Sequence, residues 1–547
     1  MQDQQARKKA ADLKNNLSRL MEKRSNWETH WQEVADYMLP RKADITLERP
    51  RGDKRHTLIF DGTAIHALEL LASSLHGMLT SSVNRWFGLR YKETLVNQDD
   101  QAREWLEDVT DKMYLAISRS NFQQEVFETY FDLIAFGTSC LQIEEDKDDI
   151  IRFSSRHIKE LYISENAKGM VDCIYRRFKM TAKATVEKFG IDNVSSKTLN
   201  TFKKSPFEDI ELCHVVKPRD MYNPRKEDKQ NMPYVSCYFE YDSGHIISEG
   251  GFKEFPYVVP RYLKASNEIY GRSPGMNALP DVKVLNKMVE VGMKAAQKQV
   301  DPPLLVPDDS MLMPIRMSPG SINYYRSGTR DRIETLNIGA NNPLGLNMED
   351  QRRQAISATF HVDQLLITEN RNMTATEVVQ RNQEKMRILG PVLGRLQSEL
   401  LQPMIIRIFN IMIRNNLFAE APEILLNQEI DVEYVSPMAL AQRGEELNSI
   451  VKGLELFGNI SQLAPVALDY IDPPGLIKNL IKILGLPATM IRSDAEVQQI
   501  AEEKAEAEAQ QIQAQQELAQ SEMARNAAPA IQAVTNAETA EREQQQQ

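Results

Sequence analysis

The sequence is poor in features that would support catalysis. Its 547 residues contain no GxxxxGK[ST] phosphate-binding loop, no GxGxxG dinucleotide motif and no HExxH zinc motif. The eight histidines are scattered, and no carboxylate spacing of the kind a magnesium-dependent nuclease needs stands out. The densest acidic cluster, residues 144–149, falls in a predicted hairpin turn, where solvated carboxylates are the simpler explanation. We therefore expect no enzyme, no cofactor and no metal.

Cysteine is also scarce and is not arranged for binding or cross-linking. The chain has four cysteines, and none forms a CxxC pair or a mixed Cys/His cluster. This pattern predicts neither a zinc site nor a disulfide framework. Free cysteine usually behaves as a small core residue, so we expect buried, reduced thiols. The four positions are Cys140, Cys173, Cys213 and Cys237.

Long hydrophobic runs and an excess of positive charge are missing as well. No stretch of about 18 apolar residues occurs, so we expect no membrane span. The first residues lack the apolar core of a signal peptide, which favours a soluble intracellular product. The formal net charge is −11, and this balance argues against tight, non-specific binding of nucleic acid.

The N-terminal part of the chain reads as helical. From about residue 4 to residue 39, large apolar side chains recur every three or four positions, and only Arg24 interrupts this stripe. Pro40 ends the helix and opens a basic loop that reaches Arg55. The loop is either a phosphate-contacting patch or a solvated segment whose charges pair with nearby acids, and we favour the second. Those nearby acids are Asp44, Glu48 and Asp53.

An antiparallel β block is predicted between residues 137 and 260. Helices are expected before it, at 61–82, 101–119 and 122–136. At Gly137 the pattern changes to short β-prone runs separated by turn residues. A short helix, 181–189, closed by Gly190, interrupts them. The expected strands are 139–144, 150–154, 161–164, 171–178, 211–216, 234–241, 244–248 and 257–259.

Two helices joined by an insert follow the β block. They are predicted at 281–299 and 347–366, with a short-stranded segment between them. Four lysines of the first helix lie within about 60° of arc at 100° per residue, so they form one basic stripe. This stripe is either a solvated face or a line of charges that faces a passing polyanion or a neighbouring subunit. The lysines are Lys283, Lys287, Lys294 and Lys298.

One very long helix is predicted from residue 374 to residue 415. Thr374 and Glu377 form a capping box at its start. Gly390 and Pro391 lie inside it, and proline kinks a helix, so we expect a kink there. The polar segment 367–373 that precedes it is too short for a domain and reads as an exposed loop. Beyond residue 415 the chain is mainly helical to about 525, and residues 526–547 have a disordered composition.

Several segments together resemble the portal, or head-to-tail connector, proteins of short-tailed bacteriophages. No single segment is specific, but their order over residues 10 to 420 is. In chain order they are Trp27, Trp31, Tyr37 and Pro40; Phe60-Asp61-Gly62-Thr63 with the run Leu71 to Thr80 and Trp86-Phe87; Phe136-Gly137-Thr138-Ser139; Tyr270-Gly271-Arg272-Ser273-Pro274-Gly275; and Asn372-Met373-Thr374-Ala375-Thr376-Glu377-Val378.

This resemblance implies an α+β, mainly α, portal fold. Residues 1–280 and the long kinked helix 374–415 would form the wing, with its helical part to about 136 and its β block at 137–260. Residues 281–300 and 347–366 would be the two stem helices, 301–346 the clip and 367–373 the channel loop. Residues 416–525 would form a helical crown. The channel-loop residues are Glu369, Asn370, Arg371 and Asn372.

The resemblance also implies a function and partners. It predicts a ring of about twelve copies at one capsid vertex, assembled in the host cytoplasm and then part of the virion. Double-stranded DNA would pass through the ring during packaging and ejection, held weakly and without sequence specificity. Expected partners are the major capsid protein, the scaffolding protein, the packaging terminase and a tail adaptor, with no membrane. The alternative is an elongated helical scaffold or adaptor protein that never forms a DNA channel.

Overall fold

The structure is a computed structural model. It describes residues 2–50, 52–91, 100–223, 225–226, 228–301, 304–305, 322, 334–335, 343–365, 387–422, 430–434 and 450–453, with several positions between 497 and 516. The chain divides into two compact units. Unit 1 comprises residues 1–90, 108–420 and 430–445, and unit 2 comprises 91–107, 421–429 and 446–547. In unit 2 the described residues are largely helical.

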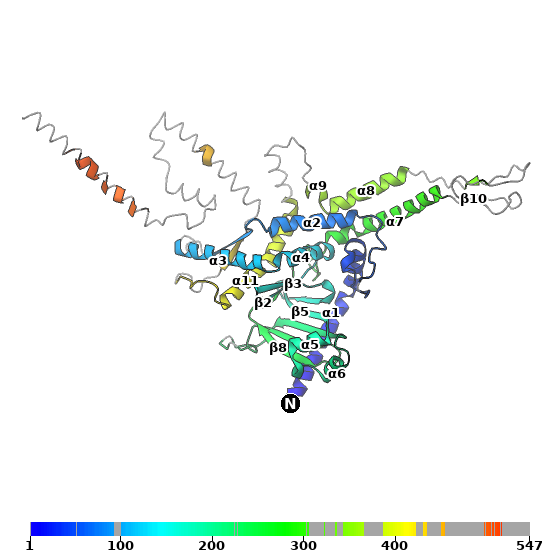
Figure 1. Cartoon of the computed structure of the whole chain (residues 1–547), viewed down its shortest axis with the longest axis horizontal. Coiled ribbons are helices and arrows are strands. Elements are labelled where there is room, and N and C mark those ends of the chain that lie inside the picture. The colour runs from blue at the N-terminus through cyan, green and yellow to red at the C-terminus, as the bar shows by residue number, and fades with distance from the viewer. Residues whose placement is uncertain are drawn as a thin grey trace, which may run out of the picture. The chain divides into compact units, whose positions relative to one another are not determined.

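The elements of the chain combine helices and antiparallel sheets, as the sequence predicts (Figure 1). The helical elements before the sheets are α1 (Gln2–Met38), η1 (Pro40–Lys42), α2 (Thr63–Leu79), α3 (Asp100–Arg119) and α4 (Phe122–Phe136). The helical elements after them are α7 (Pro274–Val300), α8 (Pro343–Thr359), α9 (Val362–Leu365), a π-helical turn η5 (Gln397–Leu401) and α11 (Gln402–Arg414).

Two sheets form the β block. A three-stranded sheet has the order β3-β2-β9, and a five-stranded sheet has the order β4-β5-β6-β7-β8, with antiparallel neighbours throughout. Their strands are β2 (Leu141–Asp146), β3 (Ile150–Ser155), β4 (Leu161–Glu165), β5 (Val171–Thr181), β6 (Asp209–Pro218), β7 (Tyr234–Glu240), β8 (Ile246–Phe252) and β9 (Tyr257–Val258). Shorter pieces are β1 (Phe87–Tyr91) with β12 (Ile430–Tyr434), β10 (Leu304–Leu305) with β11 (Glu334–Thr335), η3 (Ile158–Glu160) and η4 (Ile191–Asn193).

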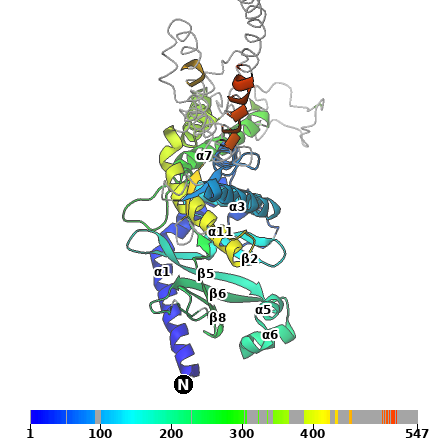
Figure 2. The same cartoon turned by 90° about the vertical axis from the view of Figure 1, so that its left-hand side faces the viewer.

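The five-stranded sheet lies between α1 and a pair of short helices (Figure 2). Leu13 and Leu17 of α1 pack on one face, in a cluster with Tyr175, Val215 and other buried side chains of β4 to β7. On the other face Phe189, near the end of α5, contacts the cluster around Phe178, Leu212 and Ile247. The short helices are α5 (Ala182–Phe189), which was predicted, and α6 (Ser196–Lys204), which was not.

Arg24 shows why the apolar stripe of α1 tolerates one charge. Its side chain is buried, and its guanidinium donates hydrogen bonds to the carbonyl oxygens of Ile158, Leu161 and Lys159. It also pairs with Glu28 and lies 3.7 Å from the ring centre of Tyr162. A buried charge is tolerated when it is paired and hydrogen-bonded, so Arg24 fastens α1 to η3 and the start of β4.

Two glycines hold the helices against the β block. Gly137 ends α4 in the left-handed conformation (φ 76°), and a Cβ added there would lie 2.2 Å from the carbonyl oxygen of Gly271. A Cβ added to Gly271 would meet the Gly137 carbonyl oxygen at the same distance. The two backbones therefore touch where no side chain fits. Around them Trp31 donates to the carbonyl oxygen of Phe136, and the Gly271 amide donates to Thr138.

The long predicted helix is irregular where it meets this junction. Residues 387–396 are helical through Gly390 and Pro391, and η5 then closes on a hydrogen bond from the Gln402 amide to the Gln397 carbonyl. Pro403 follows at once, and proline cannot donate the next helical bond. The π-helical turn was not predicted, whereas the kink at Gly390 and Pro391 stays a prediction.

Glu399 lies in this π-helical turn and binds the β block. Its carboxylate accepts hydrogen bonds from the backbone amide of Arg261 (3.0 Å) and from its guanidinium (2.8 and 3.0 Å). Arg261 also pairs with Glu165, and Arg261 is 1 % exposed and Glu399 8 % exposed. This buried network fixes the long helix to Arg261, which lies in the segment between β9 and α7.

The predicted helix 347–366 is two helices instead of one. α8 ends at Thr359, His361 adopts a left-handed backbone (φ 58°), and α9 begins at Val362. Phe360, between them, is completely buried. Burial of this aromatic side chain fixes the break. Residues 366–386, which include the predicted channel loop and the start of the long helix, lie outside the described residues.

Replacing Gly137 with alanine should destabilise the protein by at least about 2 kcal/mol, because a Cβ is disfavoured at this φ and meets the Gly271 backbone. The matched control is Gly77→Ala in α2, where a Cβ meets nothing within 4 Å and should be neutral or stabilising. Denaturant or thermal unfolding of both variants would measure the difference. Equal stabilities would show that the backbone contact is unimportant.

Glu399→Gln should cost about 3 kcal/mol, because Arg261 would lose one of its two carboxylate partners while staying buried. Glu290→Gln is the control, since Glu290 pairs with exposed lysines and such pairs contribute little. Chemical unfolding would compare them. If the two variants were equally stable, the buried network would not be what fixes the long helix.

Candidate channel and assembly surfaces

The four predicted stem lysines do not share one environment. Lys283 pairs with Glu33 of α1 (2.7 Å), so it belongs to the body of unit 1. Lys287 and Lys294 both pair with Glu290 on their own helix, and their side chains are 70 % and 63 % exposed. Within the described residues, Lys298 is exposed and has no ion pair. The stripe therefore divides into one docked lysine and three that face outward.

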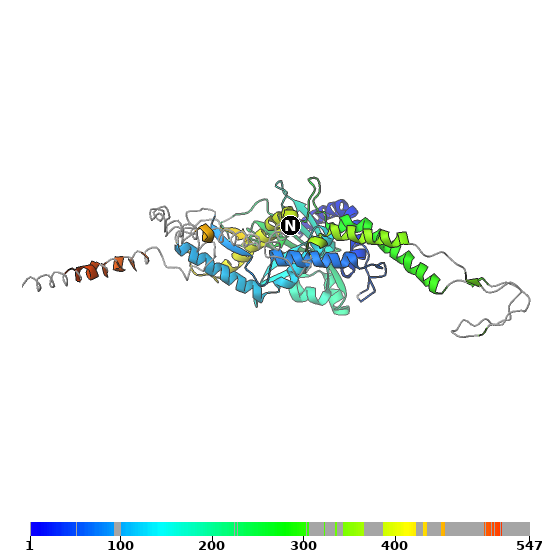
Figure 3. The same ribbon diagram turned by 90° about the horizontal axis from the view of Figure 1, so that it is seen from above.

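α7 and α8 run antiparallel and side by side (Figures 1 and 3). Asp281 of α7 pairs with Arg352 of α8 (2.7 Å), and Gly292, farther along α7, lies opposite Glu349, which precedes Arg352 in α8. A second contact fixes the base of the pair, where Arg353 binds Asp61. One side of α7 is therefore covered by α8, and another is covered by the helices of unit 1 that include α1.

The remaining face of α7 carries both valines and lysines. Val284 is 47 % exposed and Val291 is 54 % exposed. At 100° per residue, both valines lie between the side of α7 that faces α8 and the stripe of Lys287, Lys294 and Lys298. Half-exposed valines seven residues apart on a helix are typical of a surface that another helix covers. Sequence analysis singled out the lysines and missed the valines, whose spacing is the signal that could have found them.

The basic loop after α1 is paired within the subunit, and most of its partners were not the predicted ones. Lys42 contacts Glu128 and Asp132 of α4, and Arg41 also binds Glu128. Although burial alone would raise the pKa of Glu128, these two cations hold it below its usual value. The other pairs are Arg49 with Asp36 and Arg55 with Asp44. These charges fasten the loop to α1 and α4, so they do not form a free phosphate patch.

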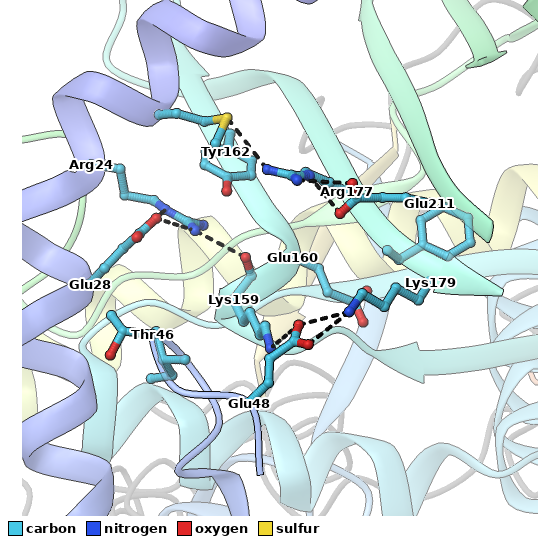
Figure 4. Close-up of a pocket in the computed structure, with 13 residues that line it drawn as sticks. Arg24, Glu28, Thr46, Glu48, Lys159, Glu160, Tyr162, Arg177, Lys179 and Glu211 are labelled. Carbon is cyan, nitrogen blue, oxygen red and sulfur yellow. Dashed lines mark hydrogen bonds and ion pairs between the residues drawn. The ribbon is translucent and has the colours of Figure 1, made fainter. Parts of the chain in front are cut away.

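A charged cavity of about 470 Å³ lies beside α1 (Figure 4). Arg24 and Glu28 reach it from α1, and the pair Arg177–Glu211 reaches it from β5 and β6. At its mouth the carboxylate of Glu48 bridges Lys159 (3.4 Å) and Lys179 (2.8 Å). The hydrogen bond from Lys179 lowers the pKa of Glu48. The charges are balanced and paired, so the cavity is not shaped for one small ion.

Two arrangements look catalytic but are structural. Gly271-Arg272-Ser273-Pro274-Gly275 has the Gly-x-Ser-x-Gly spacing of a nucleophile elbow. Ser273 is completely buried, however, where its hydroxyl caps α7 by accepting from the Met276 amide and donates to the carbonyl of Ala135. This motif therefore starts a helix.

His214 is the second such arrangement. It lies within hydrogen-bond distance of Ser236 (2.9 Å) and Tyr257 (2.8 Å) and stacks on Tyr238. It is completely buried, and burial lowers its pKa well below the usual value. A substrate could not reach this histidine, so it acts as a neutral polar link between the two sheets.

The cysteines are free, as predicted, and Cys140, Cys213 and Cys237 are buried, whereas Cys173 is only partly buried, contrary to the prediction. Burial raises the pKa of Cys140 to about 12, which makes its thiol unreactive. Among the described residues, no group of three His, Cys, Asp or Glu side chains could hold a metal ion. In the same part of the chain, no helix is both long and apolar enough to cross a membrane.

Comparison with known proteins covers almost the whole chain. Residues 10–491 match the family model of the bacteriophage head to tail connecting protein. The chain is 32 % identical to the portal protein of Salmonella phage epsilon15 over 504 residues, 90 % of each chain. It is 31 % identical to a protein named "Probable portal protein" of Bordetella phage BPP-1, over 90 % of this chain and 91 % of that one. The portal protein of Enterobacteria phage T3 is 20 % identical over 83 % of each chain.

These relatives match in length as well as in sequence, and the match includes the segments that meet at the Gly137–Gly271 junction. The chain therefore belongs to the family of bacteriophage head-to-tail connecting proteins, the portal proteins, which are structural components of the virion.

Proposed function

We propose that this chain forms a closed ring of about twelve copies at one vertex of the capsid. Double-stranded DNA passes through the ring during packaging and ejection, and the tail attaches to it. The observation that carries this proposal is the match of residues 10–491 to the connector family, with 90 % of the epsilon15 portal protein aligned. Other partners in the proposal are the major capsid protein, a scaffolding protein, a packaging terminase and a tail adaptor, with assembly in the host cytoplasm.

In this proposal residues 281–300 and 347–366 form the stem, and residues 301–346 form the clip. The wing comprises residues 1–280 and the long helix, residues 374–415, which is bent at Gly390 and Pro391. The crown comprises residues 416–525. An experimental structure of the assembled ring would test the bend, because a straight axis through residues 387–396 would contradict it.

The open face of α7 supports the proposed ring. Val284 and Val291 are about half exposed among the described residues, so each would bury further apolar surface against a neighbour. A ring interface is heterologous, so an uncovered stripe on one copy meets a different surface on the next. Lys287, Lys294 and Lys298 border the same face, where they lie close both to a neighbouring stem and to the channel. We therefore assign them to transient phosphate contacts at subunit boundaries.

The charge of the chain also suits a conduit. Phosphate contacts from lysine and arginine can dominate binding to DNA, so a wall rich in them would hold the duplex. A subunit with a formal charge of −11 repels DNA on average, and a few placed cations suffice to guide it. Arg371 of the proposed channel loop, residues 369–372, and the outward stem lysines would supply those cations.

A double variant, Val284→Asp with Val291→Asp, should weaken ring assembly at least tenfold, about 1.4 kcal/mol, because two charges would be placed in an apolar contact. The folded subunit should keep its melting temperature, since both side chains are half exposed. Negative-stain electron microscopy and light scattering would measure ring content, with a wild-type mass near twelve times 62.5 kDa.

The matched control replaces both valines with alanine, which stays apolar and helical and should assemble more fully than the aspartate variant. Wild-type ring content in the aspartate variant would place the subunit interface elsewhere. If the wild-type chain stayed an elongated monomer even with capsid and scaffolding proteins present, the adaptor alternative would replace the ring.

Deletion of residues 369–372 should leave rings intact and impair DNA packaging or retention, because the proposed loop contacts the duplex and not the neighbouring subunit. Packaged DNA per particle, measured after nuclease treatment, is the readout. Arg371→Gln should show a smaller defect of the same kind. Unchanged packaging and retention in the deletion variant would reduce the segment to a linker.

A further inference from the structure

A second cavity lies beside the N-terminal part of α1, and its charges are not balanced. Its volume is about 400 Å³. Among the described residues that line it, one is acidic, Asp220, and three are cations, Lys9, Lys217 and Arg219. The cavity beside Arg24, by contrast, is lined by paired charges of both signs. On a chain with a formal charge of −11, the second cavity is therefore a local positive site.

The floor of this second cavity is apolar. It is formed by four side chains of the buried cluster between α1 and the five-stranded sheet, which are Leu13, Val215, Val235 and Cys237. Lys217 is the register partner of Val235, so its side chain lies on the same face of the sheet. A concave apolar surface with a few polar groups around it is suited to one large side chain of a ligand.

Arg219 is held in place without a carboxylate partner. Its guanidinium donates from Nε and Nη2 to three backbone carbonyls, those of Lys229, Met232 and Gly250. These bonds fix the position of the charge, and within the described residues Nη1 has no partner. A positioned guanidinium of this kind is a ready donor to a carboxylate.

The two lysines of the cavity can also receive an anion. Lys217 is half-buried and has no ion pair within the part of the chain that the structure describes. Lys9 pairs with Glu249, but their side chains are 38 % and 36 % exposed. Exposed pairs of this kind contribute little to stability, so Lys9 can exchange its partner at low cost.

The rim of the cavity carries an exposed methionine on an anchored segment. The Arg219 amide donates to the carbonyl of Pro233, and a Cβ added to Gly251 of β8 would lie 2.7 Å from the carbonyl oxygen of Lys229. The chain between β6 and β7 is thereby held against the sheet. Met221, in this segment, lines the cavity and is 90 % exposed. An exposed methionine beside an apolar floor is suited to cover the side chain of a partner.

We propose that this cavity binds an acidic peptide segment of a partner protein. One large apolar side chain of the peptide lies on the floor under Met221, and carboxylates beside it accept hydrogen bonds from Lys9, Lys217 and Arg219. Duplex DNA fits less well, because its phosphate contacts are spread along the backbone and would leave the apolar floor uncovered. The inference does not depend on the proposed ring, since the lining residues belong to one subunit.

Binding of labelled peptides to the full chain tests this site. Three peptides of equal length serve as probes: an acidic peptide with a central tryptophan, the same peptide with alanine at the centre, and a basic peptide with the tryptophan. Fluorescence anisotropy should show that the acidic tryptophan peptide binds at least tenfold more tightly than either of the others. Higher salt should weaken its binding, because partly exposed charges are screened.

Variants of the cavity assign the binding to this site. Lys217→Glu should weaken binding of the acidic tryptophan peptide at least tenfold, because it reverses a charge at the cavity. The matched control is Lys204→Glu, which makes the same charge change at an exposed position at the end of α6 and should bind like the wild type. Thermal unfolding would verify that both variants are folded.

A second pair of variants covers the case in which Lys217→Glu does not fold. Met221→Asp should weaken binding of the acidic tryptophan peptide, while Met221→Leu should stay near wild type, and neither should unfold the chain because Met221 is exposed. Equal affinity of the wild type and the folded cavity variants would overturn the proposal. So would an absence of binding by all three peptides, or a duplex oligonucleotide that displaces the acidic peptide. A chain that binds the peptide but forms no rings would contradict the proposed function and support this site.

Discussion

The close contact between Gly137 and Gly271 is the constraint on which the rest of unit 1 depends. At this point the end of α4, the start of the β block and the approach to α7 come within backbone distance of one another. Trp31 of α1 donates into the same junction, and Ser273 ties the first turn of α7 to Ala135. Because interiors pack without voids, a shift here would be transmitted to α1, to both sheets and to the stem pair.

The junction also explains why separate stretches of the sequence indicate one family. Phe136 to Ser139 and Tyr270 to Gly275 are far apart in the chain and touch in the structure. Trp27 and Trp31 pack against Tyr270. This contact brings the segment with the two tryptophans to the same junction. Each segment alone is short and unspecific, but together they describe one packed site.

Hydrophobic periodicity and turn residues predicted the helices and strands. They could not predict which groups the charged side chains contact. The stripe of α1, the change to strands at Gly137 and most of α7 follow from periodicity and turn residues, so they were accessible to sequence analysis. Arg24 was visible as an interruption, but nothing local shows that carbonyls of η3 and of the first residue of β4 accept its hydrogen bonds. The basic loop was expected to pair with its own acids, and instead Lys42 crosses to Glu128 and Asp132. Such contacts depend on tertiary packing and have no period.

The π-helical turn at residues 397–401 has a consequence for the geometry of the long helix. A π-helical turn takes up more residues than an α-helical turn, so everything after it is rotated about the axis relative to a regular helix. Arg407 thereby faces the β block, where its guanidinium donates to the carbonyl of Ile143, on the same side as Glu399. Compared with an uninterrupted α-helix of the same sequence, in which each residue turns by about 100°, the extra residue in this turn sets back the C-terminal half of the helix by most of one such step. The number of residues in this turn therefore sets how far the C-terminal half of the helix is rotated about its axis. Substitutions that keep this number leave the rotation unchanged.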